Sequence, residues 1–330
     1  CDGTADDEPT GCDTQAVLDS TDAFNAALAV DLCRKTTETA TGAQRTWGVV
    51  DATFVAPDGS DSCPAEGSGA AGSCAASATY ALGHGNLTKL GVNAPQGGGT
   101  HMLGISSGTA RDPSDPGYEN VAGAGQGNCS GTGGYDKAFT VGAAAGFPAP
   151  APACPGVTAG KRHDGPALRL VIRVPTNAQS FTFNENFFTP EFPEYVCSSF
   201  NDSFVVEMAP APTGAGTGGN VAFDQSGNPI SVNNALLQVC TAQTAGQKAF
   251  ACPLGPSSLA STGFAGHAAT GWLQTQVSID PSLKGKDITL LFALWDSGDG
   301  CLDSTALIDN FQWSTQPGQN TPVTQPNPAQ

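Results

Sequence analysis

Alternating apolar and polar residues dominate the second half of the chain. Runs with this period of two predict half-buried strands, because successive side chains of a strand point to opposite faces. Within residues 180–188, three phenylalanines fall on one face and two asparagines on the other, which predicts one buried face. The strands predicted in this half are ALRLVIRV (167–174), SFTFNENFF (180–188), SFVVEM (203–208), GWLQTQVSI (271–279), ITLLFALW (288–295) and TALIDNFQW (305–313).

The first half has one predicted helix and weaker strand signals. Ser20 or Thr21 can cap a helix in STDAFNAALAVDLC (20–33), and Asp22 suits its first turn. Its apolar residues fall on one side, so the helix is predicted to cover a sheet; they are Phe24, Ala27, Leu28 and Leu32. Short strands are predicted at 45–55, 101–107 and 137–142. Strands that no further amphipathic helices separate predict an all-β fold, an antiparallel β-sandwich.

Composition agrees with many short strands joined by long loops. The chain of 330 residues has 42 Gly and 24 Pro, residues that suit turns and loops rich in Gly and Pro. A net charge of -17 argues against nucleic acid and anionic membrane surfaces as partners, and it is compatible with bound cations. No apolar run is long enough to span a membrane, so membrane insertion is not expected.

Eleven cysteines without a C-x-x-C spacing indicate an oxidising compartment and therefore a secreted protein, outside the cell or at its surface. Short gaps suggest disulfide-closed loops, although sequence alone does not fix the connectivity. The odd cysteine pairs with another chain, pairs with an absent segment, or stays free. The expected pairs are Cys1 with Cys12, Cys63 with Cys74, Cys129 with Cys154, and Cys240 with Cys252.

The two ends of the chain differ in composition from the domain predicted at residues 20–313. Residues 1–19 are acidic and turn-rich, and Cys1 is either a lipidated N-terminus or part of a longer Asp-rich segment. The second interpretation is favoured, because the acids after Cys1 are spaced like oxygen donors of a calcium loop; they are Asp2, Asp6, Asp7 and Glu8. Residues 314–330 form an uncharged, Pro-rich extended tail. We expect this tail either to clamp a neighbouring subunit by pairing with a sheet edge, or to fold back on its own domain.

The acidic segment WDSGDGCLDSTALIDN (295–310) is the strongest candidate for a metal site. Four carboxylates lie within fourteen positions, at Asp296, Asp299, Asp303 and Asp309. Two glycines between them let the backbone curl, and calcium takes six to eight oxygen ligands from flexible loops. The alternative is an acidic turn whose side chains cap backbone amides, and the spacing does not match an EF-hand loop.

The segment NFFTPEFPEYVCSSFNDSF (186–204) is dense in carboxylates and aromatic rings. Glu185, Glu191 and Glu194 raise the possibility of a glycoside hydrolase, which requires paired carboxylates. All three lie within ten residues, whereas an acid and a base usually come from separated strands. We therefore expect a stiff structural or binding corner that includes Glu191 and Glu194, with Asn201 and Asp202 tying the turn. No catalytic residue is predicted.

Several motifs together resemble the bacterial choice-of-anchor L domain. They are WGVV (47–50), GISSGTA (104–110), RVPTNAQSFTFNENFFTPEFPEYVCSSFNDSFVV (173–206), GNPISVN (227–233) and LWDSGDGCLDSTALIDNFQW (294–313). The likeness covers about residues 15–313. It implies a secreted or surface-anchored module with a jelly-roll-like β-sandwich, in which Asp296, Asp299 and Asp303 form the cation side.

The function expected from the sequence is that of an extracellular structural or adhesive protein, such as a self-assembling filament or matrix subunit. Calcium is the expected cofactor, and self-association through the C-terminal tail is the expected interaction. The alternative is a calcium-dependent carbohydrate-binding module with glycans as partners. A glycoside hydrolase is the third and weakest hypothesis, so the protein is not expected to be an enzyme.

Overall fold

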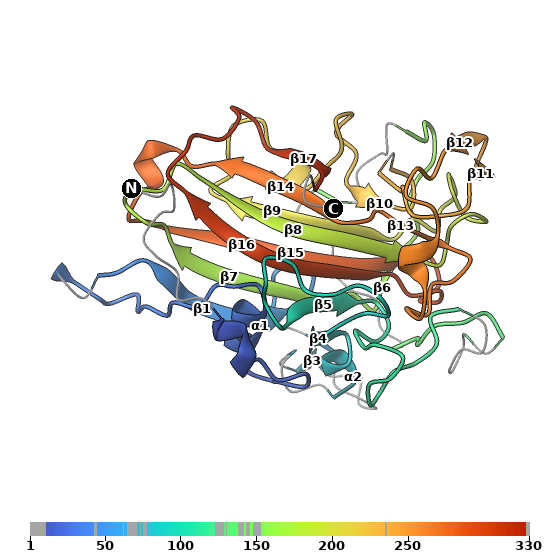
Figure 1. Ribbon diagram of the computed structural model, residues 1–330, viewed down its shortest axis with the longest axis horizontal. Coiled ribbons are helices and arrows are strands. Elements are labelled where there is room, and N and C mark those ends of the chain that lie inside the picture. Colours follow the sequence, from blue (N-terminus) through green and yellow to red (C-terminus); the bar gives the residue numbers. More distant parts are fainter. Residues whose placement is uncertain are drawn as a thin grey trace.

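The computed structural model is an antiparallel β-sandwich of two sheets with one helix near the N-terminus (Figure 1). It describes residues 11–42, 45–61, 63–64, 71–72, 74, 78–122, 129, 131–137, 142, 146–147, 153–234 and 236–327. The fold class predicted from the alternating pattern is confirmed. All six strands predicted in the second half form, whereas the stretch predicted at 137–142 lies largely outside the described residues.

The first sheet has the strand order β1-β7-β15-β9-β10, and β6 pairs with β15 beside this path. Its strands are β1 (Gly48–Val55), β6 (Arg162–His163), β7 (Ala167–Arg173), β9 (Ser203–Ala209), β10 (Ile230–Ser231) and β15 (Asp287–Ser297). The second sheet has the order β17-β14-β8-β16-β5-β4, and β13 pairs with β8. Its strands are β4 (His84–Leu87), β5 (Met102–Ser106), β8 (Ser180–Thr189), β13 (Ala268–Ala269), β14 (Leu273–Ser278), β16 (Thr305–Ser314) and β17 (Val323–Pro326).

Two small hairpins and several short helices lie outside the two main sheets. The hairpins are β2 (Cys63–Pro64) with β3 (Ala71–Gly72), and β11 (Gln243–Ala245) with β12 (Lys248–Phe250). The helices are η1 (Cys12–Gln15), α1 (Ala23–Ala29), α2 (Ala78–Ala81), η5 (Thr217–Gly219), η6 (Ser257–Leu259) and η7 (Pro281–Leu283).

The long strands wind back and forth between the sheets, as in a jelly roll. Strands β7, β9 and β15 belong to the first sheet, whereas β8, β14 and β16, which alternate with them along the chain, belong to the second. The β8–β9 and β15–β16 connections therefore both cross between the sheets. Register places these crossings together, because Trp295 pairs with Ser203 in one sheet and Thr305 pairs with Phe188 in the other. Both crossings lie at the same end of the sandwich.

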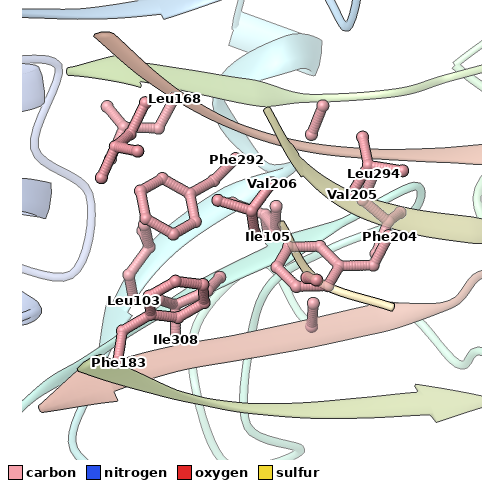
Figure 2. Close-up of a cluster of buried hydrophobic side chains, with 14 of the residues drawn as sticks. Leu103, Ile105, Leu168, Phe183, Phe204, Val205, Val206, Phe292, Leu294 and Ile308 are labelled. Carbon is pink, nitrogen blue, oxygen red and sulfur yellow. The ribbon is translucent and has the colours of Figure 1, made fainter. Parts of the chain in front are cut away.

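The core lies between the sheets and consists of aliphatic and aromatic side chains (Figure 2). Phe183 of β8 and Phe292 of β15 meet edge to face across this layer, with ring centroids 5.5 Å apart. Burying one such ring contributes on the order of 1.5–3 kcal/mol. The large apolar residues on the inner faces of the predicted strands thus form the core between the sheets.

Strand β8 is buried on both faces, so the prediction of one solvent-facing side is wrong. The face that carries Asn184 and Asn186 is covered by loops whose side chains form a second apolar cluster. In this cluster Phe188 packs against Phe264, with ring centroids 5.4 Å apart. The two asparagines are buried because these loops exclude water from the outer face of the second sheet.

Helix α1 is shorter than predicted and closes one side of the sandwich. Asp22 is the N-cap, since its carboxylate accepts from the backbone N–H of Phe24 at 3.0 Å, whereas Ser20 and Thr21 were the predicted caps. The helix contacts β1 and β7 of the first sheet and β4 and β5 of the second. It therefore lies between the edges of the two sheets (Figure 1), not across the face of one.

Ten cysteines form five disulfides, and two of the expected pairs are present: Cys63–Cys74 and Cys240–Cys252. The expected pairs Cys1–Cys12 and Cys129–Cys154 are wrong. Cys12 pairs with Cys33, Cys129 with Cys301, and Cys154 with Cys197, while Cys1 lies outside the described residues. The two wrong predictions joined cysteines that are close in the sequence, whereas the fold brings together cysteines that are distant in the sequence. The five disulfides indicate an oxidising environment.

The Pro-rich tail folds back on its own domain, which is one of the two alternatives left open by the sequence. Its strand β17 pairs with β14 at the edge of the second sheet, with Gln325 opposite Gln274. The segment before it is held by side chains, because the hydroxyl of Ser180 donates to the carbonyl oxygen of Gln316 at 2.8 Å. These contacts order a segment whose composition favours an extended chain.

Candidate functional site

The two crossing loops bring four carboxylates into the interior at one end of the sandwich. Glu191 follows β8, Asp202 precedes β9, Asp296 lies in β15, and Asp303 precedes β16. At most 1% of each residue is exposed. We call these four residues the acidic centre. It unites two segments, 186–204 and 295–310, that the sequence analysis treated as separate candidates.

Asp202 links the two crossing loops. Its backbone N–H donates to Glu191 Oε2 at 3.3 Å, and its Oδ1 accepts from the backbone N–H of Ser297 at 2.9 Å. Its second oxygen, Oδ2, is buried without a hydrogen-bond partner. Asp202 therefore fixes the relative position of the loops, and the hydroxyl of Ser304 also acts on its carboxylate.

Asp296 and its neighbour Asp299 have different environments. Asp296 Oδ1 accepts from the backbone N–H of Gly300 at 3.2 Å, and Oδ2 is buried without a partner. Asp299 is exposed, and its carboxylate caps the backbone N–H of Cys301 at 3.0 Å. Asp296 thus belongs to the interior of the centre, whereas Asp299 performs the capping role that the sequence analysis held as the alternative.

Asp303 completes the acidic centre from the start of β16. Its Oδ2 accepts from the backbone N–H of Tyr135 at 2.5 Å, while Oδ1 is buried without a partner. A Cβ atom at position 108 would collide with this carboxylate, so Gly108 is required by the close approach of the chain. The GISSGTA motif (104–110), which contains Gly108, therefore packs against the carboxylate of Asp303.

A buried lysine lies next to the acidic centre. Lys137 Nζ donates to the carbonyl oxygen of Ser107 and, at 3.2 Å, to that of Asp164. Burial lowers the pKa of Lys137, while the nearby charges of Asp164, Asp303 and Asp296 act in the opposite direction. One ammonium group cannot neutralise four buried carboxylates. The sequence contained no signal that this residue would be internal.

Burial raises the pKa of every carboxyl in the acidic centre. The pKa of Glu191 and that of Asp296 lie well above their usual range, because desolvation is reinforced by the charge of Asp202. Desolvation raises the pKa of Asp202 to about 8. For Asp303 desolvation is partly offset by Lys137, and its pKa rises to about 6. The centre therefore favours bound protons or a bound cation over four bare charges.

The corner predicted at 186–204 has the expected structural features. The side chain of Asn201 accepts from the backbone N–H of Asn233 at 3.1 Å, and Phe192 packs edge to face on Phe250 with centroids 5.0 Å apart. Glu194 is exposed, whereas Glu191 is buried. Glu185 lies in the core on β8, so the three glutamates suggested for a hydrolase do not form a common site.

Asp309 is separate from the acidic centre, so the prediction that it joins Asp296 and Asp303 is wrong. It faces the outer side of the second sheet, where its Oδ2 accepts from the backbone N–H of Gln96 at 2.5 Å. Desolvation raises its pKa to about 8, with further contributions from Asp31 and Asp13. These three residues form a second acidic cluster. The predicted ligands Asp2 and Asp6 lie outside the described residues.

The second cluster depends on a pairing that sequence reasoning missed. The Cys12–Cys33 disulfide brings Asp13 and Asp31 together, and burial next to Asp13 raises the pKa of Asp31 to about 6. Burial also acts to raise the pKa of Asp13, but hydrogen bonds from Thr100 and His101 outweigh it and lower that pKa. The available signal was that Asp13 follows Cys12 and Asp31 lies two residues before Cys33, but it could be used only with the correct disulfide.

The donor chemistry of the acidic centre suits a hard cation. Asp296 Oδ2 and the hydroxyl of Ser297 are buried without a partner, while the hydroxyls of Ser304 and Ser107 act on the carboxylates of Asp202 and Asp303. Within the described ranges, however, no three His, Cys, Asp or Glu side chains converge as a ready site for an ion. A bound cation would therefore need backbone or water oxygens in addition to these carboxylates.

The fold and the site define a disulfide-linked β-sandwich with a buried acidic centre. No protein-family model matches the chain, and no curated protein matches it. Among the residues that the structure describes, no helix has the length and apolarity needed to cross a membrane.

Proposed function

We propose that the protein is a secreted structural or adhesive subunit of the choice-of-anchor L type, and that its acidic centre binds calcium. Disulfides support a location outside the cell or at its surface. The observation that carries the calcium assignment is the gathering of buried carboxylates at Asp202, Asp296 and Asp303, in which Asp296 Oδ2 lacks a partner. A cation at these oxygens would offset the desolvation of the carboxylates and join the two crossing loops.

Calcium should raise the melting temperature of the protein. An ion that binds the folded state alone stabilises it by about 2.7 kcal/mol at a concentration one hundred times its dissociation constant. Thermal unfolding with calcium, with magnesium and after chelation measures this effect. The Asp296→Asn variant should lose the response, because it removes a buried carboxylate with a free oxygen.

Two further variants locate the ion. Asp51→Asn makes the same chemical change at an exposed position on β1 and should keep the full response. Asp309→Asn tests the second acidic cluster. A melting temperature that does not change with calcium, or a response that only Asp309→Asn removes, would show that the acidic centre is not the calcium site.

Self-association is proposed to occur by exchange of β17 between two copies. The strand lies at a sheet edge and pairs with β14 through residues 323–326 only. The eight residues between Ser314 and Val323 would let it reach the same edge of a second copy. After exchange, β17 of one copy forms with β14 of the other the same backbone hydrogen bonds that it forms in the closed monomer. Exchange therefore needs no contacts that the monomer lacks.

A pair of cysteines can distinguish the exchanged from the closed form. Gln274 and Gln325 are cross-strand partners, so the double variant Gln274→Cys and Gln325→Cys should form a disulfide between β14 and β17. Exchange predicts covalent dimers and larger species on a non-reducing gel after oxidation at high protein concentration. The Gln274→Cys and Gln325→Cys single variants serve as controls. Exclusive formation of a monomeric intrachain disulfide, with unchanged size by light scattering, would rule out exchange.

A further inference from the structure

A cationic pocket of about 430 Å³ lies at the end of the sandwich opposite the acidic centre. Its walls include Arg34, Arg45, Thr46, Trp47, Arg173 and Thr176. Register fixes its position, because Arg173 pairs with Gly48 at one end of β7 and with Asp287 at the start of β15. Three of the six arginines of a chain with net charge -17 therefore gather around one pocket.

The three arginines have different roles. Arg173 is buried, forms two hydrogen bonds with the carboxylate of Asp287 at 2.8 and 3.1 Å, and also donates to the carbonyl oxygen of Thr37. Its charge is therefore compensated. The ion pairs found in the described part of the chain include neither Arg34 nor Arg45. These two guanidinium groups give the pocket its positive charge.

The two uncompensated arginines are positioned by contacts that leave most of their N–H groups available. Arg34 lies over the ring of Trp47, with its guanidinium carbon 4.7 Å from the ring centroid. Arg45 is exposed and donates to the carbonyl oxygen of Gly285 at 3.1 Å. A guanidinium has five N–H donors, so each group retains donors for a ligand.

Trp47 holds the guanidinium of Arg34 and offers no accessible donor of its own. The residue is 5% exposed, and its indole N–H is buried without a hydrogen-bond partner, as are those of Trp295 and Trp313. The two guanidinium groups are therefore the donors that select the ligand, which must be negatively charged.

We propose that this pocket binds the carboxylate of an acidic sugar of the uronic acid type, one or two rings in size. A carboxylate matches the planar guanidinium fork, and the volume falls in the range of small-molecule sites, roughly 300–1,000 Å³. The hydroxyls of Thr46 and Thr176 are suited to sugar hydroxyl groups.

This site is independent of the proposed calcium site. The pocket and the acidic centre lie at opposite ends of β15, near Asp287 and Asp296 respectively. Loss of sugar binding therefore leaves the calcium response unchanged, and loss of calcium binding leaves the arginines in place. An experiment can therefore disprove the sugar site without disproving the calcium site, and the reverse also holds.

Calorimetric titration of the full chain with D-glucuronate and D-galacturonate tests the proposal. Binding is expected at about millimolar concentration or below, as befits a ligand with few atoms. Arg45→Gln should weaken it about tenfold or more, which corresponds to one lost charge-assisted hydrogen bond. Arg45→Lys should retain part of the affinity, because it keeps the charge and loses the fork. Arg169→Gln is the matched control, since this arginine lies outside the pocket and pairs with Asp51.

Four results would overturn the proposal. Absence of heat and of chemical-shift changes with both uronates at about tenfold the expected concentration would show that the pocket does not bind them. Equal affinity for D-glucose would show that the carboxylate is not recognised. Equal loss of binding in Arg45→Gln and Arg169→Gln would show that the site lies elsewhere. Tighter binding of inorganic phosphate or of an acidic peptide than of either uronate would assign the pocket to another ligand.

Discussion

Replacing Glu185 by Gln should stabilise the protein above about pH 4.5, by an amount that grows up to about pH 8, and should flatten the pH dependence of its unfolding free energy. Glu185 lies on β8 between Phe183 and Phe187, and its side chain is fully buried. Thr275 Oγ1 donates to its Oε1 at 2.6 Å, while Oε2 has no partner. Desolvation raises the pKa of Glu185 to about 8, although the hydrogen bond from Thr275 acts to lower it.

The sign of the effect follows from proton binding. Between about pH 4.5 and pH 8 the unfolded chain releases the proton of Glu185 and the folded chain keeps it. The contribution of this group to stability is full below the unfolded pKa, and it declines by about 1.4 kcal/mol per pH unit as the pH rises toward the folded pKa. The glutamine of the variant carries no such penalty, so the two proteins should agree near pH 4.5 and diverge by several kcal/mol near pH 8.

Urea unfolding at a series of pH values measures this difference. Glu194→Gln is the control, because the same substitution at an exposed position of the corner should leave the pH profile unchanged. The pKa values of Asp31, Asp202, Asp303 and Asp309 also rise into this range, so only the comparison between variants isolates Glu185. A Glu185→Gln profile parallel to that of the wild type would contradict the assignment of a buried, protonated carboxyl.

Removing the Cys129–Cys301 disulfide should lower the unfolding free energy by about 4 to 5 kcal/mol. The bond closes a segment of 172 residues, and the entropy that a disulfide removes from the unfolded chain grows with the length of the closed loop. It also fixes the loop between Asp296 and Asp303. The double variant Cys129→Ser and Cys301→Ser should therefore lose stability and also lose the calcium response.

A second double variant provides the comparison. Cys63–Cys74 closes only 11 residues, and its replacement by Ser should cost about 3 kcal/mol or less without changing the response to calcium. Denaturant unfolding with and without calcium reports both quantities. A calcium response that survives in Cys129→Ser and Cys301→Ser would show that the ion does not depend on this loop.

Much of the fold could be predicted because strands have a strong local signal. The period of two in residues 167–174, 203–208 and 305–313 placed β7, β9 and β16 to within one residue. The burial of both faces of β8 could not be predicted in this way. It depends on loops distant in sequence, such as the one that carries Phe264 against Phe188.

The candidate site was predicted only in part, for reasons of geometry. Asp303 and Asp309 are only six positions apart, but β16 begins at Thr305, and an extended chain of that length spans up to about 20 Å. A strand prediction over 305–313 already implied this separation. The approach of Asp202 and Glu191 to Asp296 results from two crossings between sheets, and no local pattern specifies which loops will meet.

The position of the Cys129–Cys301 bond also determines how the molecule would respond to tension. A pull applied between residues 11 and 327 passes through this covalent link, so the 172-residue segment that it closes carries no load. The Cys154–Cys197 and Cys240–Cys252 bonds close 43 and 12 positions within this segment, so reduction of Cys129–Cys301 alone would release on the order of 400 Å of contour length at roughly 3.6 Å per residue. Under oxidising conditions the chain would act as a short tether, and reduction of this one bond would lengthen it by that amount.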